Sequence, residues 1–319
     1  MSGKGENLKT MAGNGFHVPR GFSIGNDVYQ RAIQPHIPKI QEILRRLDPE
    51  DAAENIGREI FVRTMIDTQE LAKVLRKEIE QAIPDAKSFA VRSSGSCSTK
   101  AGKISEDSAS ISLAGQFSSF LNVPRKKLVD AVLGVWASLF NPRSIREFSA
   151  NLDDTYAKGS RMSVVVQEYL PARSSVVMMG RCPLEEANVG VIEATHGPCE
   201  AIVAGLVTPD LIRYDRTSLK ILDWEVGAKE ETVRFEPFTQ PWAENRRLIS
   251  NQRKQRETPA ITKDECQQLI QLSQRLEKLF GGKAQDVEAI FLEKTGELCV
   301  LQSRDVTTIK NQTNEKEKS

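Results

Sequence analysis

Two short apolar runs near the end of the chain constrain its fold more than any other feature. The runs Asp286–Leu292 and Leu298–Arg304 flank a polar segment, residues 293–297, that contains Gly296. Strand-prone runs separated by a short glycine-containing segment predict a β-hairpin.

The polar side chains of this hairpin fall in a pattern. Because side chains alternate across a strand, Gln302 and Arg304 are predicted on the face opposite Leu301 and Ser303. With Glu288 on the partner run, a carboxylate, an amide and a guanidinium can share one patch, which suits a metal-bound polyphosphate. The alternative is an ordinary hairpin with polar residues on its wet face, and the pattern alone leaves both open.

A second candidate feature lies earlier in the chain. The short apolar strand Ser88–Val91 is followed directly by Arg92 and then by a region rich in Ser and Gly. Backbone N–H groups and hydroxyls in such a loop can approach phosphate oxygens closely. A phosphate cradle and a mobile surface loop fit this stretch equally well.

Strand and helix patterns alternate along the rest of the chain. The Thr262-Lys263-Asp264-Glu265 capping pattern predicts a helix that runs to about Phe280. Residues 230–258 are polar and predict a loop-rich surface excursion. Further helices are predicted over 26–47, 48–83 and 125–148, and strands or hairpins over 162–170, 174–179, 189–194 and 211–226.

Composition excludes several classes of protein. The 319 residues are 39% hydrophobic with a formal net charge of +1, so no global field attracts nucleic acid or an anionic membrane. No apolar run approaches the ~20 residues that span a bilayer, and the polar first residues lack the apolar core of a signal peptide. We therefore expect a cytoplasmic location. The five cysteines are widely spaced and predict reduced thiols.

Several separated stretches along the chain form one ordered set of motifs. They are Gly3–Leu8, Val18–Phe22, Val91–Ser94, Glu106-Asp107, Ala114–Phe117, Phe120–Val123, Trp136–Arg143, Val207–Asp210, Asp286–Glu288 and Leu301–Arg304. In this order they resemble the nucleotide-binding domain of phosphoenolpyruvate synthases and pyruvate phosphate dikinases, and the resemblance covers nearly the whole chain.

The resemblance implies an α+β fold of the ATP-grasp type, in which two lobes hold ATP between them. On this basis the N-terminal lobe is expected over residues 1–162, with a phosphate lid loop at 93–115. The C-terminal lobe is expected over 163–309, and the charged tail 310–319 is expected to be disordered.

The resemblance also implies ATP and Mg²⁺ as cofactors and assigns site residues. Arg92 and Arg304 are the expected catalytic residues, and Glu288 and Gln302 the expected metal ligands. The residues expected to bind the nucleotide are Lys4, Arg92, Gln167, Glu168, Leu170, Glu200, Gln302 and Arg304.

The chain departs from the family pattern at several positions. Val176 and Gly180 replace a family glycine and hydroxyl residue, Cys199 stands within an altered Gly197–Glu200 element, and Asp305 replaces a proline after Arg304. Residues 97–105 also look like an insertion in the loop after Arg92. These departures put catalytic competence in doubt.

The three histidines do not sit in a motif that resembles the family's phosphohistidine motif. His196, the nearest to the expected site, is interpreted as a structural neighbour of the nucleotide. We expect a phosphotransferase that passes phosphate from ATP to a histidine on a separate phosphohistidine or phosphoenolpyruvate-domain protein. The alternatives are a catalytically impaired nucleotide-binding or regulatory module, and a fragment of a longer dikinase.

Overall fold

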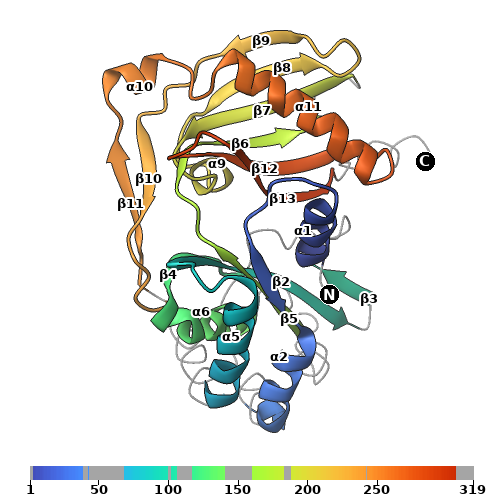
Figure 1. Cartoon of the computed structure of the whole chain (residues 1–319), viewed down its shortest axis with the longest axis vertical. Helices are drawn as coiled ribbons and strands as arrows, with labels where there is room; N and C mark the ends of the chain where they lie inside the picture. Colours follow the sequence, from blue (N-terminus) through green and yellow to red (C-terminus); the bar gives the residue numbers. More distant parts are fainter. Residues whose placement is uncertain are drawn as a thin grey trace, which may run out of the picture. The chain divides into compact units, whose positions relative to one another are not determined.

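The computed structural model describes residues 3–38, 42, 68–99, 102–105, 117–140, 160–182, 188–241 and 243–306. Helices and antiparallel sheets are both abundant, which confirms the predicted α+β class (Figure 1). The chain divides into two compact units. Unit 1 holds residues 1–14, 18–170 and 235–247, and unit 2 holds residues 15–17, 171–234 and 248–319.

Unit 1 is built on an antiparallel sheet in the order β1-β5-β2-β3, with β4 pairing to β2. Its strands are β1 (Gly21–Ile24), β2 (Ser88–Thr99), β3 (Gly102–Ser105), β4 (Phe120–Pro124) and β5 (Ser160–Glu168). Its helices are α1 (Gly3–Gly13), α2 (Asn26–Ile33), α5 (Thr68–Ala82) and α6 (Leu128–Ala137), with 3-10 turns at Gln34–His36, Arg125–Lys127 and Ser138–Phe140.

The core of unit 1 is organised around α6, where eight of ten residues are buried. The ring of Trp136 meets that of Tyr29 edge to face, with centroids 5.6 Å apart, a favourable aromatic geometry. Phe238, from the 235–247 segment, is 1% exposed and packs on Phe120 at 5.0 Å between ring centroids. This distant segment therefore completes the core.

Unit 2 is built on a six-stranded antiparallel sheet in the order β13-β12-β6-β7-β8-β9. The strands are β6 (Ala172–Met179), β7 (Val189–His196), β8 (Asp210–Asp215), β9 (Ile221–Glu225), β12 (Gln285–Leu292) and β13 (Leu298–Asp305). Helix α11 (Lys263–Leu279) lies across this sheet, and the short α9 (Glu200–Val203) packs against β6 and β7 (Figure 1).

Helix α11 follows the sequence prediction closely. Thr262 accepts a hydrogen bond from the backbone N–H of Glu265, and the Glu265 carboxylate accepts one from the N–H of Thr262, so the capping box is complete. At the other end Gly281 and Gly282 take positive φ angles of 72° and 81°. Only glycine adopts this conformation without strain, so the helix ends there.

A buried ion pair holds one edge of unit 2. Lys229 and Asp210 are both fully buried and form a salt bridge. The Asp210 carboxylate also accepts hydrogen bonds from the backbone N–H groups of Gly227, at 2.9 Å, and Ala260, at 2.6 Å. A buried charge needs such compensation, because an unpaired one is very costly.

Three expectations require correction. The predicted loop after Arg92 begins later than expected, because β2 continues to Thr99 and pairs with both β5 and β3. The predicted loop-rich excursion at 230–258 instead contains β10 (Glu231–Phe235), β11 (Arg246–Ser250) and α10 (Arg253–Glu257), with β10 and β11 paired.

The third concerns the extent of a helix. The predicted helix over 125–148 is shorter where described, with α6 ending at Ala137. Strand β5 spans the expected boundary at 162/163 and lies in unit 1, and the division into two lobes stays a prediction. The predictions for 43–67, 106–116, 141–159 and 310–319 lie outside the described residues.

Candidate functional site

In unit 2 the predicted hairpin is present and its polar residues face one another. β12 pairs with β13 so that Glu288 stands opposite Gln302, and Asp286 opposite Arg304. Residues paired across a sheet share a face, so these four side chains lie on one side. A register shift between Glu288 and Ala289 ends this alternation.

Arg304 is anchored by Asp286, a residue that the sequence did not single out as a site residue. Its Nε and Nη2 donate to Oδ2 of Asp286 at 2.8 and 2.7 Å. Burial raises the pKa of the Asp286 carboxyl, and the negative charge of Glu288 raises it further. The positive charge of Arg304 and its hydrogen bonds act in the opposite direction and lower this pKa. The pair therefore fixes the guanidinium while leaving 37% of its side chain exposed.

A further carboxylate, Glu193 on β7, belongs to the same face. The strand register aligns Glu288 with Val177 and Val177 with Glu193. Burial, and then the charge of Asp286, raise the pKa of Glu193. Sequence reasoning missed Glu193 because it lies in an ordinary alternating strand, and only the sheet order brings it near the hairpin.

The donor set of this face fits a Mg²⁺–nucleotide complex. Mg²⁺ is usually bound by one or two carboxylates plus substrate phosphates and water. Glu288 and Gln302 offer one carboxylate and one amide oxygen at paired positions. Among the described residues, no group of three or more His, Cys, Asp or Glu is arranged to hold a metal ion.

The carboxylate of Asp305 is bonded to Lys283 and Gln285. Its carboxylate accepts hydrogen bonds from Lys283 Nζ at 2.8 Å and Gln285 Nε2 at 3.0 Å. Burial alone works to raise its pKa, but these hydrogen bonds outweigh it and the pKa lies below its usual value. The charge that the sequence placed beside Arg304 is thus compensated by Lys283.

In unit 1, Lys4 and Arg92 lie in neighbouring elements. Lys4 is in α1, and its Nζ donates to the carbonyl oxygen of Ser93 at 3.3 Å. Arg92 precedes Ser93 in β2 and is half-buried, with Val165 of β5 as its strand partner. The first turn of α1 therefore places the ammonium group beside the segment that carries Arg92.

The end of β5 holds the other predicted residues of unit 1. Gln167 is 3% exposed, and its Nε2 has no hydrogen-bond partner within the described part of the chain. The Glu168 carboxylate accepts hydrogen bonds from the N–H and guanidinium of Arg20, at 2.7 to 3.2 Å. Leu170 is half-buried just beyond the strand. Arg20 thus holds the Glu168 side chain, and the Nε2 group of Gln167 is available to donate a hydrogen bond.

The altered element before α9 is firmly packed. Glu200 is the first residue of α9 and is half-buried. The thiol of the buried Cys199 donates to the carbonyl oxygens of Ala289 and Val176, at 3.3 and 3.5 Å. His196 Nε2 lies 3.1 Å from the carbonyl oxygen of Gln255, which accords with a structural role for this histidine.

The described cysteine side chains are free thiols. Cys182, Cys199, Cys266 and Cys299 are all buried and form no disulfide with one another. Burial raises the pKa of the Cys266 thiol to about 11, so this group is protonated at neutral pH. No helix in the described ranges is long and apolar enough to cross a membrane.

Comparisons with known proteins place these features in a family. The model of the AMP/ATP-binding domain of pyruvate phosphate dikinase matches residues 1–319. A protein of Archaeoglobus fulgidus described as a probable phosphoenolpyruvate synthase is 32% identical over 99% of this chain, and one from Methanocaldococcus jannaschii with the same description is 29% identical over 98%. A rifampicin phosphotransferase of Streptomyces sviceus is 28% identical over 97%.

The chain corresponds to only part of each relative. It spans 41%, 26% and 34% of these three proteins, respectively. The family model covers the whole of this chain. The chain therefore belongs to the family of AMP/ATP-binding domains of pyruvate phosphate dikinase.

Proposed function

We propose that the chain binds ATP with Mg²⁺ and passes a phosphoryl group to a histidine on a separate protein. The observation that carries this proposal is the face formed by Glu288, Gln302 and Arg304, with Arg304 held by Asp286. Phosphoryl transfer needs mainly positioning and charge neutralisation. A fixed guanidinium beside a carboxylate and an amide oxygen supplies both.

In this proposal the two units supply complementary groups. Lys4 and Arg92 of unit 1 contact phosphate oxygens, and the end of β5, from Gln167 to Leu170, contacts the adenine. Glu288 and Gln302 of unit 2 hold the metal ion, Arg304 acts on the transferred phosphoryl group, and Glu200 lies near the nucleotide. The fold type that the family resemblance implies for this chain is ATP-grasp.

The orphaned amide of Gln167 supports the adenine assignment. A buried donor without a partner costs about 1–3 kcal/mol, and such a group calls for an acceptor. A ring nitrogen of adenine is a suitable acceptor. The Glu168 side chain is already bound to Arg20, so this residue contributes its backbone.

The test is transfer of label from ATP, carrying ³²P in both its β and γ phosphates, to purified candidate phosphohistidine-domain proteins. We expect an acid-labile, base-stable product that requires Mg²⁺. Glu288→Ala and Arg304→Ala should each reduce its formation at least 100-fold. Lys294→Ala, which removes an exposed cation from the turn of the same hairpin, is the matched control. Full activity of both site variants would refute the proposal.

A second candidate function is a nucleotide-binding module without catalysis. The observation that favours it is Val176, which replaces a family glycine and is fully buried. ATP binding by calorimetry, without transfer to any acceptor over hours, would select this alternative.

A further inference from the structure

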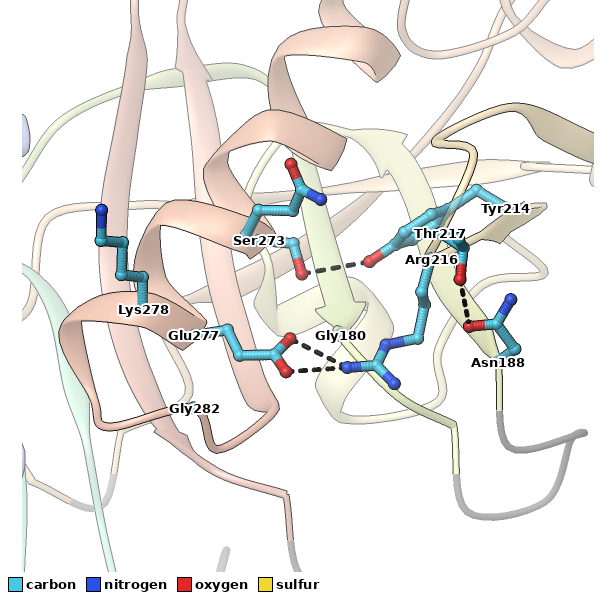
Figure 2. Close-up of a pocket in the computed structure, with 10 residues that line it drawn as sticks. Gly180, Asn188, Tyr214, Arg216, Thr217, Ser273, Glu277, Lys278 and Gly282 are labelled. Atoms are coloured by element: carbon cyan, nitrogen blue, oxygen red, sulfur yellow. Dashed lines mark hydrogen bonds and ion pairs between the residues drawn. The ribbon is translucent and has the colours of Figure 1, made fainter.

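Unit 2 contains a cavity of about 380 Å³ beside the C-terminal half of α11. Its walls come from the end of β6, the end of β8, the turn after β8 and α11 (Figure 2). Among the described residues, those that line it are Gly180, Asn188, Tyr214, Arg216, Thr217, Ser273, Gln274, Glu277, Lys278 and Gly282.

This cavity lies on the opposite face of the sheet from Glu288 and Arg304. Met179 and Val191 pair with one another, and Met179 pairs with Asp286, so these residues share the face that carries Arg304. Gly180 follows Met179 and therefore turns to the other side, where a Cβ on it would lie 2.9 Å from Ser273 Oγ of α11. The cavity is thus separate from the candidate nucleotide site.

Gly180 and Gly190 leave space for the side chains that form the inner wall. A Cβ on Gly190 would lie 2.2 Å from the Tyr214 ring, so only glycine allows the ring to pack against β7. The Tyr214 hydroxyl then reaches α11 and donates to Ser273 Oγ at 3.1 Å. Tyr214 and Ser273 are 1% and 4% exposed, so this pair of hydroxyls is a fixed part of the wall.

A second polar bridge forms the opposite wall. Arg216 Nη2 donates to both carboxylate oxygens of Glu277, at 2.8 and 2.9 Å. Figure 2 shows the two bridges on either side of Gly180, and the Lys278 ammonium group directed away from them. Because Glu277 neutralises Arg216, the two bridges carry no net charge, and Lys278 at the rim is the remaining charged group among the described lining residues.

Two carbonyl groups in the last turn of α11 are bonded to the glycines that follow the helix. The carbonyl oxygen of Glu277 accepts a hydrogen bond from the Gly282 N–H at 2.8 Å, and that of Lys278 accepts one from Gly281 at 3.4 Å. The negative end of the helix is therefore capped. Thr217 and Asn188, which bond to one another at 3.1 Å, complete the rim with a hydroxyl and an amide.

We propose that this cavity binds an uncharged, hydroxyl-rich molecule of about monosaccharide size. Hydroxyl, amide, carboxylate and guanidinium groups together offer both donors and acceptors, which matches neighbouring hydroxyls on one ligand. The absence of net charge on the two bridges favours an uncharged ligand over a free ion. The volume of about 380 Å³, near the lower end of the ~300–1,000 Å³ usual for ligand pockets, suits a molecule of monosaccharide size. The inference does not depend on the nucleotide chemistry proposed above.

The test is ligand-detected NMR of the full chain with glucose, ribose and myo-inositol, and with phosphate and glycerate as charged comparisons. We expect millimolar binding of at least one uncharged probe and at least tenfold weaker binding of both anions. Gln274→Trp, at an exposed position on the rim, should weaken sugar binding at least tenfold. Gln271→Trp, exposed on the same helix and outside the cavity lining, should not.

Three outcomes would overturn the proposal. The first is that no uncharged probe binds at about 50 mM, a concentration roughly ten times the weakest Kd expected of such a site. The second is that sugars bind equally well to Gln274→Trp and to the native chain. The third is that an anion binds more tightly than the uncharged probes.

Discussion

Arg304 and Asp286 stand opposite one another on β13 and β12, and both guanidinium hydrogen bonds between them end on the same carboxylate oxygen, Oδ2. The Asp286 side chain is 14% exposed. Asp286 therefore fixes the position of Arg304 while it raises the pKa of Glu193 across the sheet.

Asp286→Asn tests this double role. Loss of the carboxylate charge should lower the pKa of Glu193, because the second-largest cause of its raised value disappears. The free energy of unfolding should fall by no more than about 1 kcal/mol, since the ion pair is partly exposed. Carbon-13 NMR of the Glu193 carboxyl measures the first effect and urea unfolding the second. An unchanged Glu193 pKa would show that the two carboxyls do not interact.

Glu193→Gln should make stability less dependent on pH. Folding raises the pKa of Glu193, so the folded chain binds this proton more tightly than the unfolded chain. The native chain should therefore lose stability as pH rises from about 4.3, the unfolded value, through the raised folded value. The variant lacks this loss and should be the more stable of the two at pH 7. Urea unfolding between pH 4 and 8 compares them, with Glu297→Gln at an exposed position as control.

Local sequence signals predicted the parts of the fold that depend on short-range interactions. The hairpin of β12 and β13 and the capping box of Thr262 and Glu265 both rest on residues within about twenty positions of each other. Turn geometry and side-chain alternation decide such elements. The polar face with Glu288, Gln302 and Arg304 followed directly from them.

Long-range pairing produced the features that the sequence did not reveal. Ser93 and Ser94 read as loop residues, yet they lie in β2 because Val164 and Ser163 of β5 pair with them. Glu193 joins the candidate site only through the order of four strands. Sheet partners far apart in the chain override local propensity, and a single sequence does not show which strands will be neighbours.

Gly190→Ala should destabilise unit 2. The added Cβ would meet the ring of Tyr214 at 2.2 Å, and this ring is 1% exposed and held by the hydrogen bond of its hydroxyl to Ser273. Overpacking of a core costs about 1–3 kcal/mol, and we expect the upper part of this range. Gly13→Ala is the matched control: nothing lies within 4 Å of its added Cβ, and alanine at this helical position should stabilise by about 0.5–1 kcal/mol. Equal thermal unfolding of the two variants would contradict the packing argument.

Lys229→Met should be the most damaging of these substitutions. Lys229 and Asp210 are fully buried, and removal of one partner leaves an uncompensated buried charge, which costs about 3–5 kcal/mol. Addition of Asp210→Asn should restore only part of this loss. The asparagine oxygen can still accept from Gly227, but its amide nitrogen would meet the N–H of Ala260, which now donates to Asp210 Oδ2. Urea unfolding gives the three free energies, with Lys220→Met at an exposed position as control. A loss below about 1 kcal/mol in Lys229→Met would show that the pair does not stabilise the fold.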